Sequence, residues 1–291
     1  MSDKLIVACV LEAALFLGGI AVLWRYLAMR RDRPASPLPL WTIPGHLYAL
    51  AIIRVVAITF AFQLATNHVL ARIEAFTPES RTLLGSLSLQ VGLGLGLLFA
   101  WWALKSHRLQ AHIEASLNST PALPARLPTA RIPLAALFTF LAIIALVAPL
   151  TILWTALLQS LRIELQPQNA AELLLQANSP VMRWIFALFA VVIVPIVEEA
   201  LFRCGIFRYL RGRIPPLAAI VGSALFFGAA HLNLGVFVPL TVFGVVQAIA
   251  YERTGRVAVP IIAHALFNLH TMIFFLLEID PYESIRGWLA P

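Results

Sequence analysis

The 291-residue sequence is 60% hydrophobic and only 12% charged, and its mean hydropathy is +0.87. Soluble domains are nearer half apolar and about a quarter charged, so this composition excludes a soluble globular protein. The apolar runs are long and continuous, which also excludes the short alternating strands of a transmembrane β-barrel. The net charge of +7 is better explained by basic loops beside apolar spans than by nucleic acid. We therefore expect a lipid bilayer and no nucleic acid as partner.

Eight apolar stretches follow one another along the chain, at lengths near the roughly 20 residues that a helix needs to cross the hydrocarbon core. They cover about 5–24, 46–66, 84–104, 132–154, 181–203, 216–233, 235–251 and 257–278. The sequence thus predicts an all-α polytopic membrane protein with about eight transmembrane helices. It falls into two parts: residues 1–155, whose helices carry no recognised motif, and residues 180–278, which carry the polar residues described below.

Lysine and arginine gather on one side of these predicted spans. They are concentrated in the connections after the first, third, fifth and seventh spans and are sparse in the alternate connections. Cytoplasmic loops of membrane proteins are enriched in these residues. The pattern therefore predicts that the basic loops are cytoplasmic and that both termini lie outside.

Two charged residues interrupt the first two spans. Glu12 and Arg54 each stand about a dozen residues from the end predicted to be cytoplasmic, so their depths match. One hypothesis is that the two pair between helices. The alternative is that Arg54 snorkels to the interface without a partner.

The fifth span contains the stretch "VIVPIVEEALFRCGIF", residues 192–207, with three ionisable groups. Such groups inside a span are costly and usually functional. Glu199 and Arg203 are four residues apart on one helix face and are predicted to pair. Glu198 is about 140° round the helix from Arg203, without a counter-charge in its own helix, which suits a general base. Pro195 is predicted to kink the helix and to open space for water beside Glu198.

Two further polar sets stand on later spans. "FFGAAHLN" places His231 at the end of the sixth span, and "IIAHALFN" places His264 and Asn268 four residues apart on the eighth. Counted from the basic loops, these residues and Glu198 lie at similar depths of roughly 12–22 Å. A shared layer is what a site within the membrane needs. Each alone has a simpler interpretation, a hydrogen-bonded core histidine or a structural Glu–Arg clamp.

Together these residues resemble the CPBP family, the intramembrane endopeptidases that include CAAX proteases and bacteriocin-processing proteins. The family pattern is E-E-x-x-x-R, then F-x-x-x-H, then H-x-x-x-N or D. Here it reads "EEALFR" (198–203), "FGAAH" (227–231) and "HALFN" (264–268). The resemblance covers about residues 180–275 and implies that 180–278 is a catalytic helical core.

The resemblance implies a role for each matching residue. Glu198 would activate water as general base, and His231 would assist it. His264 and Asn268 would stabilise the oxyanion of the tetrahedral intermediate, while Glu199 and Arg203 would support the site. A metal-free glutamate mechanism is favoured, with no cofactor. The alternative is zinc held by Glu198, His231 and His264, although the sequence has no H-E-x-x-H motif.

The resemblance implies an endopeptidase that hydrolyses a peptide bond in a membrane-associated or C-terminal segment of a protein or peptide. The few charges and short loops look like a bacterial member of the family, in the inner (plasma) membrane. Two alternatives remain open. One is a non-catalytic immunity or scaffold protein of the same fold, and the other is a transporter that uses the buried groups as a proton relay.

Overall fold

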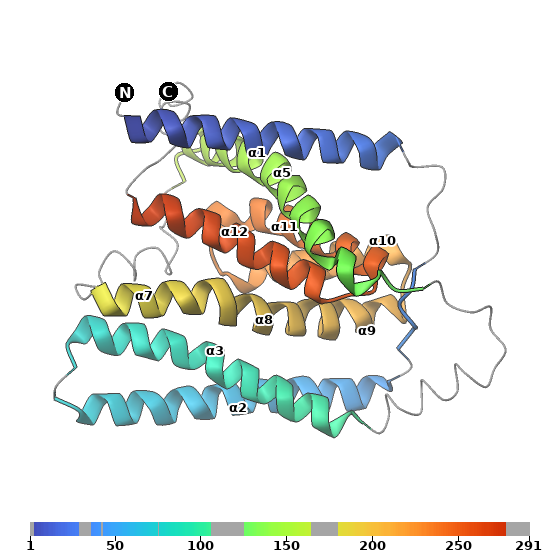
Figure 1. The fold of residues 1–291 in the computed structure, drawn as a ribbon. Helices are drawn as coiled ribbons and strands as arrows, with labels where there is room; N and C mark the ends of the chain where they lie inside the picture. Colours follow the sequence, from blue (N-terminus) through green and yellow to red (C-terminus); the bar gives the residue numbers. More distant parts are fainter. Residues whose placement is uncertain are drawn as a thin grey trace. The chain divides into compact units, whose positions relative to one another are not determined.

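The computed structural model describes residues 3–28, 36–41, 43–74, 76–105, 125–163 and 180–277, and these residues form helices joined by turns (Figure 1). The predicted fold class, an all-α polytopic membrane protein, is confirmed. The helical elements are α1 (Asp3–Ala28), α2 (Gly45–Arg72), α3 (Pro78–Ala103), η2 (Thr129–Arg131), α5 (Ile132–Ser160), α7 (Pro180–Leu188), η3 (Phe189–Ile193), α8 (Val194–Glu199), η4 (Ala200–Phe207), α9 (Arg208–Arg211), α10 (Pro216–Ala230), α11 (Leu234–Thr254) and α12 (Ala258–Leu276).

Each of the eight predicted spans coincides with a helical segment. Among the described residues, six helices are long and apolar enough to cross a membrane: Lys4–Ala28, Gly45–Arg72, Ser80–Ala103, Thr129–Ser160, Pro180–Arg211 and Leu234–Thr254. The apolar helices Pro216–Ala230 and Ala258–Phe274 are shorter. The chain is therefore an integral membrane protein. Parts of the basic connections, 29–35 and 106–124, lie outside the described residues.

The helices form two compact units that alternate along the chain. Unit 1 comprises Met1–Leu38, Leu123–Pro167 and Ile214–Pro291, and unit 2 comprises Pro39–Ala122 and Gln168–Arg213. Each unit contains helices from both of the parts predicted from the sequence, residues 1–155 and residues 180–278. The division of the chain into those two parts stays a prediction.

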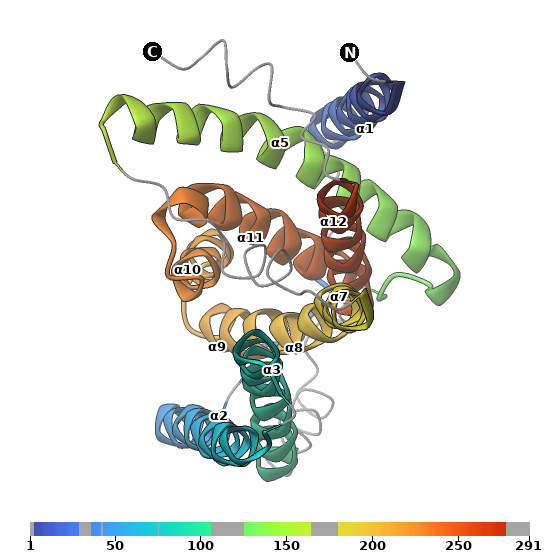
Figure 2. The ribbon, with the colours of Figure 1, turned by 90° about the vertical axis from the view of Figure 1, so that its left-hand side faces the viewer.

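In unit 1, α5 is the central helix, and α1, α11 and α12 all pack against it (Figure 2). The face that α1 buries is a narrow stripe of Ala8, Glu12 and Gly19. A side chain at Gly19 would collide with the backbone of Leu141 on α5, so glycine there permits the close approach of the two helices. The helices α10 and α11 pack as a pair.

In unit 2, α2 and α3 lie side by side (Figure 1). A Cβ atom on Gly96 would lie 2.9 Å from the backbone oxygen of Val55, and one on Gly92 would lie 3.0 Å from that of Thr59. These glycines, four residues apart, form the small-residue face that lets membrane helices pack closely. The other side of α3 contacts α7 and α8.

The helix from Pro180 to Arg211 departs twice from regular α geometry. The π-helical segments η3 and η4 flank the short α8, which contains Pro195, Glu198 and Glu199. Just before the proline, the Val194 N–H bonds the carbonyl of Phe189, five residues back. Proline cannot donate a backbone hydrogen bond, and such π-helical turns in helices often occur at functional sites.

Glu12 has a polar partner within its own unit. Its carboxylate contacts the Nε2 atom of His270 on α12. Arg54 is exposed on α2, in the other unit. The pairing of Glu12 with Arg54 stays a prediction.

Candidate active site

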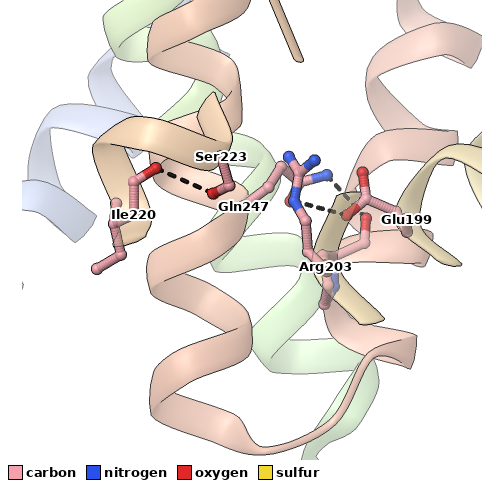
Figure 3. A network of polar contacts seen from close by, with 6 residues as sticks. Glu199, Arg203, Ile220, Ser223 and Gln247 are labelled. Atoms are coloured by element: carbon pink, nitrogen blue, oxygen red, sulfur yellow. Dashed lines mark hydrogen bonds and ion pairs between the residues drawn. The ribbon is translucent and has the colours of Figure 1, made fainter. Parts of the chain in front are cut away.

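The carboxylate half of the site lies in unit 2 and centres on a buried ion pair. The Nε atom of Arg203 lies 3.0 Å from Oε2 of Glu199 (Figure 3). Glu199 is fully buried and Arg203 is 1% exposed. The predicted pairing at four-residue spacing is confirmed. A buried charge without a partner is strongly destabilising, so this pair secures the helix segment that carries Glu198.

Glu198 is half-buried and stands on α8 directly before Glu199. That Glu198 has no counter-charge in its own helix stays a prediction. The π-helical segment η4 begins directly after Glu199. Of the two carboxylates, only Glu199 is fully buried.

The histidine half of the site lies in unit 1, where α10 ends in a hydrogen-bonded imidazole. His231 follows the last residue of α10, and its Nδ1 atom lies 2.9 Å from the carbonyl oxygen of Phe227. A carbonyl only accepts, so Nδ1 carries the proton and the neutral ring keeps a lone pair on Nε2. That nitrogen can take a proton or accept a hydrogen bond.

The turn after His231 is strained. Leu232 has φ of 49°, a left-handed conformation that is uncommon for residues other than glycine, asparagine and aspartate. Asn233 then caps α11 by accepting a hydrogen bond from the Gly235 N–H at 2.9 Å. The reversal between α10 and α11 is therefore completed within three residues, directly after the candidate histidine.

His264 on α12 is 4% exposed and is held by aromatic rings. Its ring meets Phe243 edge-on with centroids 4.8 Å apart, and Phe227 edge-on at 6.1 Å. The Phe227 ring also lies 5.0 Å from that of His231. One buried phenylalanine thus contacts both candidate histidines. Asn268 is half-buried one helical turn beyond His264, as the spacing predicted.

Sequence reasoning missed one polar residue of this unit. Gln247 on α11 is fully buried, and its Nε2 atom donates to the carbonyl of Pro260 at 2.9 Å. Pro260 stands one turn before His264, so this bond fixes the start of α12. The signal that could have found it is a lone amide in the apolar stretch "GVVQAIA". Nearby, the Ser223 hydroxyl donates to the carbonyl of Ile220 at 3.0 Å (Figure 3).

In the described part of either unit, no three His, Cys, Asp or Glu side chains form a group able to hold a metal ion. The zinc ligand set Glu198, His231 and His264 draws on both units and stays an alternative to the metal-free prediction.

Comparison with known proteins agrees with the motifs. Residues 180–270 match the family model described as Type II CAAX prenyl endopeptidase Rce1-like. This segment of the chain is similar to that family. The matched range holds all six residues of the candidate site. It does not include α1, α2, α3 or α5.

Two bacterial proteins are similar to part of the chain. "Putative membrane peptidase YdiL" of Bacillus subtilis is 35% identical over 95 residues, which are 33% of this chain and 36% of that protein. "Membrane-embedded CAAX protease MroQ" of Staphylococcus aureus is 40% identical over 101 residues, 32% of this chain and 40% of that protein. The match thus spans well under half of either relative. No solved structure matches the chain significantly.

Proposed function

We propose that this protein is an intramembrane endopeptidase that cleaves a peptide bond in a membrane-associated or C-terminal segment of a protein or peptide. The observation that carries the proposal is the buried Glu199–Arg203 pair beside the half-buried Glu198. Keeping two carboxylates and a guanidinium within an apolar span is costly, which favours a catalytic use. The Rce1-like match over the same residues adds to this argument.

In the proposed reaction, the Glu198 carboxylate takes a proton from water, and the resulting hydroxide adds to the carbonyl carbon of the scissile bond. The oxygen of that carbonyl becomes an oxyanion, to which His264 and Asn268 donate hydrogen bonds. The carbon–nitrogen bond then breaks as Glu198 passes its proton to the leaving amine. One water is consumed, and a carboxylic acid and an amine are formed. The proposal requires the two halves of the site to act on the same peptide bond.

The remaining residues have supporting roles. His231 would orient the water through Nε2, since its Nδ1 proton is engaged by the Phe227 carbonyl. Phe227 and Phe243 would hold His264 in position through ring contacts. Glu199 would keep Arg203 in place and so support the helix segment that carries Glu198. We assign no step to a metal or cofactor.

The proposed setting is the inner membrane of a bacterium, with the basic loops in the cytoplasm. Both relatives named above come from bacteria, and their names place them in membranes. The substrate would be reached from the bilayer or its surface. A C-terminal segment suits such a site because a chain end needs less unwinding than the middle of a membrane helix.

The experiment is cleavage of a panel of membrane-anchored peptides by the purified protein in liposomes, with products identified by mass spectrometry. Glu198→Gln is the test variant. Glu252→Gln is its matched control, because Glu252 is another buried glutamate at the end of an apolar helix. Cleavage should be lost in the first variant and kept in the second, with or without a strong chelator.

The other outcomes separate the alternatives. Loss of wild-type cleavage when a chelator is added would favour the zinc-dependent alternative. The immunity or scaffold alternative would be favoured by two results together. The wild type would cleave no peptide of the panel, and Glu198→Gln would bind a partner protein as tightly as the wild type does. Proton flux across the liposome membrane that stops in Glu198→Gln would favour the proton-relay transporter.

A further inference from the structure

The pair formed by Glu12 and His270 lies outside the proposed chemistry and joins helices from the two ends of the chain. Glu12 is the only charged residue in the apolar stretch 5–24 of α1, and it is 6% exposed. The residues stand 258 positions apart, and their side chains meet in unit 1. An ionisable residue inside an apolar helix is costly, so an interaction that retains it calls for a function.

Two phenylalanine rings and the Glu12 carboxylate contact the His270 imidazole. The 29 residues of α5, "IPLAALFTFLAIIALVAPLTILWTALLQS", contain no titratable side chain, and α5 presents the ring of Phe140 at 6.0 Å. On α12 the ring of Phe274 lies 4.9 Å away, edge-on. A carboxylate only accepts hydrogen bonds. The Nε2 atom of His270 therefore carries a proton and donates the hydrogen bond that the Glu12 carboxylate accepts. The Nδ1 atom is buried without a hydrogen-bonding partner among the described residues.

The pair acts on the helix that carries two candidate catalytic residues. His264 and Asn268 share one face of α12, and His270 lies about 120° round the helix from His264. Glu12 therefore holds α12 from a different side. The narrow face that α1 buries against its neighbours contains Gly19, two turns beyond Glu12. α1 is thereby fixed along α5 by close packing and to α12 by a polar contact.

We infer that Glu12 and His270 are positioning residues, which set the rotation of α12 and so the direction of His264 and Asn268. This inference rests on the proposed function for its catalytic consequence. It concerns a contact that the matched family range does not contain, because α1 lies outside residues 180–270. Helix α1, which carries no recognised motif, thereby gains a role in the site.

The test uses the full-length protein in liposomes with four variants. Glu12→Gln and His270→Leu each break the pair, and the double variant Glu12→His/His270→Glu reverses it. Thr271→Val is the matched control, since Thr271 is the next residue, is exposed, and donates its hydroxyl to the carbonyl of Phe267 in its own helix. Two readouts are taken: hydrogen exchange of residues 258–274, and kcat and KM per folded molecule.

Each single variant should lower kcat about 10- to 100-fold with KM changed less than about 2-fold, because a small displacement of catalytic groups slows the chemical step. Hydrogen exchange of the backbone amides in residues 258–274 should become faster in each single variant. The reversed pair should restore both to within about 5-fold of the wild type, and Thr271→Val should match the wild type. A purely structural pair would lower the folded fraction and leave kcat per folded molecule unchanged, which would overturn the inference.

Failure of the proposed function is separate from failure of this inference. If the wild type cleaves no peptide, the endopeptidase proposal fails, and the positioning of α12 is then judged by exchange alone. Faster exchange in both single variants with recovery in the reversed pair would support it. Wild-type exchange in both single variants, or no recovery in the reversed pair, would overturn it.

Discussion

The two halves of the candidate site hold their polar groups in different ways. In unit 2, charge is balanced by charge, since Glu199 and Arg203 form an ion pair in a helix distorted by π-helical turns. In unit 1, the imidazoles are held by a backbone carbonyl and by the edges of phenylalanine rings. A charged group in an apolar span needs a counter-charge, whereas a neutral imidazole needs only a hydrogen bond and packing.

Because of this difference, mutations in the two halves should have different effects on stability and activity. Loss of one partner in the carboxylate half leaves a buried charge and should affect stability first. Loss of an imidazole in the histidine half removes a hydrogen-bonding group from a packed aromatic cluster and should affect activity first.

The largest effect is expected for Arg203→Met. It leaves the fully buried Glu199 without its cation and should lower the free energy of unfolding by about 3–5 kcal/mol. The measurement is thermal and denaturant unfolding in detergent. The double variant Glu199→Gln/Arg203→Met should recover most of the loss. A single variant within about 1 kcal/mol of the wild type would show that the pair is not essential to the fold.

In the histidine half, His264→Ala should lower kcat about 10²- to 10³-fold, as expected for removal of one oxyanion donor, while the protein stays folded. Steady-state cleavage in liposomes measures this. His68→Ala is the control, because His68 is exposed on α2. If stability fell as far as in Arg203→Met, the contrast between the two halves would be lost.

The aromatic support can be tested with Phe227→Leu. Phe227 contacts both His231 and His264, so its replacement should lower kcat about 10-fold and stability by about 1 kcal/mol. Phe226→Leu is a matched control, since the neighbouring ring is 60% exposed. Equal effects of the two substitutions on kcat would argue against a positioning role for Phe227.

The smallest effect is expected for Pro195→Ala. Alanine restores a backbone N–H and lets the π-helical turn before Glu198 relax toward regular α geometry. Activity should fall about 5-fold while the free energy of unfolding changes by less than about 1 kcal/mol. Pro149→Ala, in the interior of α5, is the control for removing a proline from a membrane helix. Parallel losses of activity and stability at Pro195 would indicate packing alone.

The sequence alone predicted the helices and the Glu199–Arg203 pair, because apolar length and four-residue spacing are local properties. It did not predict the π-helical segments on either side of α8, since these change the number of residues per turn. It did not predict the contact of Glu12 with His270, because depth matching between neighbouring spans cannot identify a partner 258 positions away. Gln247 was missed because an uncharged amide adds little to a charge-based search.

The central claim is that Glu198 activates the water that attacks the peptide bond, and single-turnover cleavage by Glu198→Gln tests it most directly. With a cleaved peptide in hand, the wild type and the variant are compared in the same liposomes at saturating enzyme. We predict a cleavage rate at least about 10³-fold below that of the wild type, with an unchanged unfolding temperature. A rate within about 10-fold of the wild type would contradict the assignment of Glu198 as the general base.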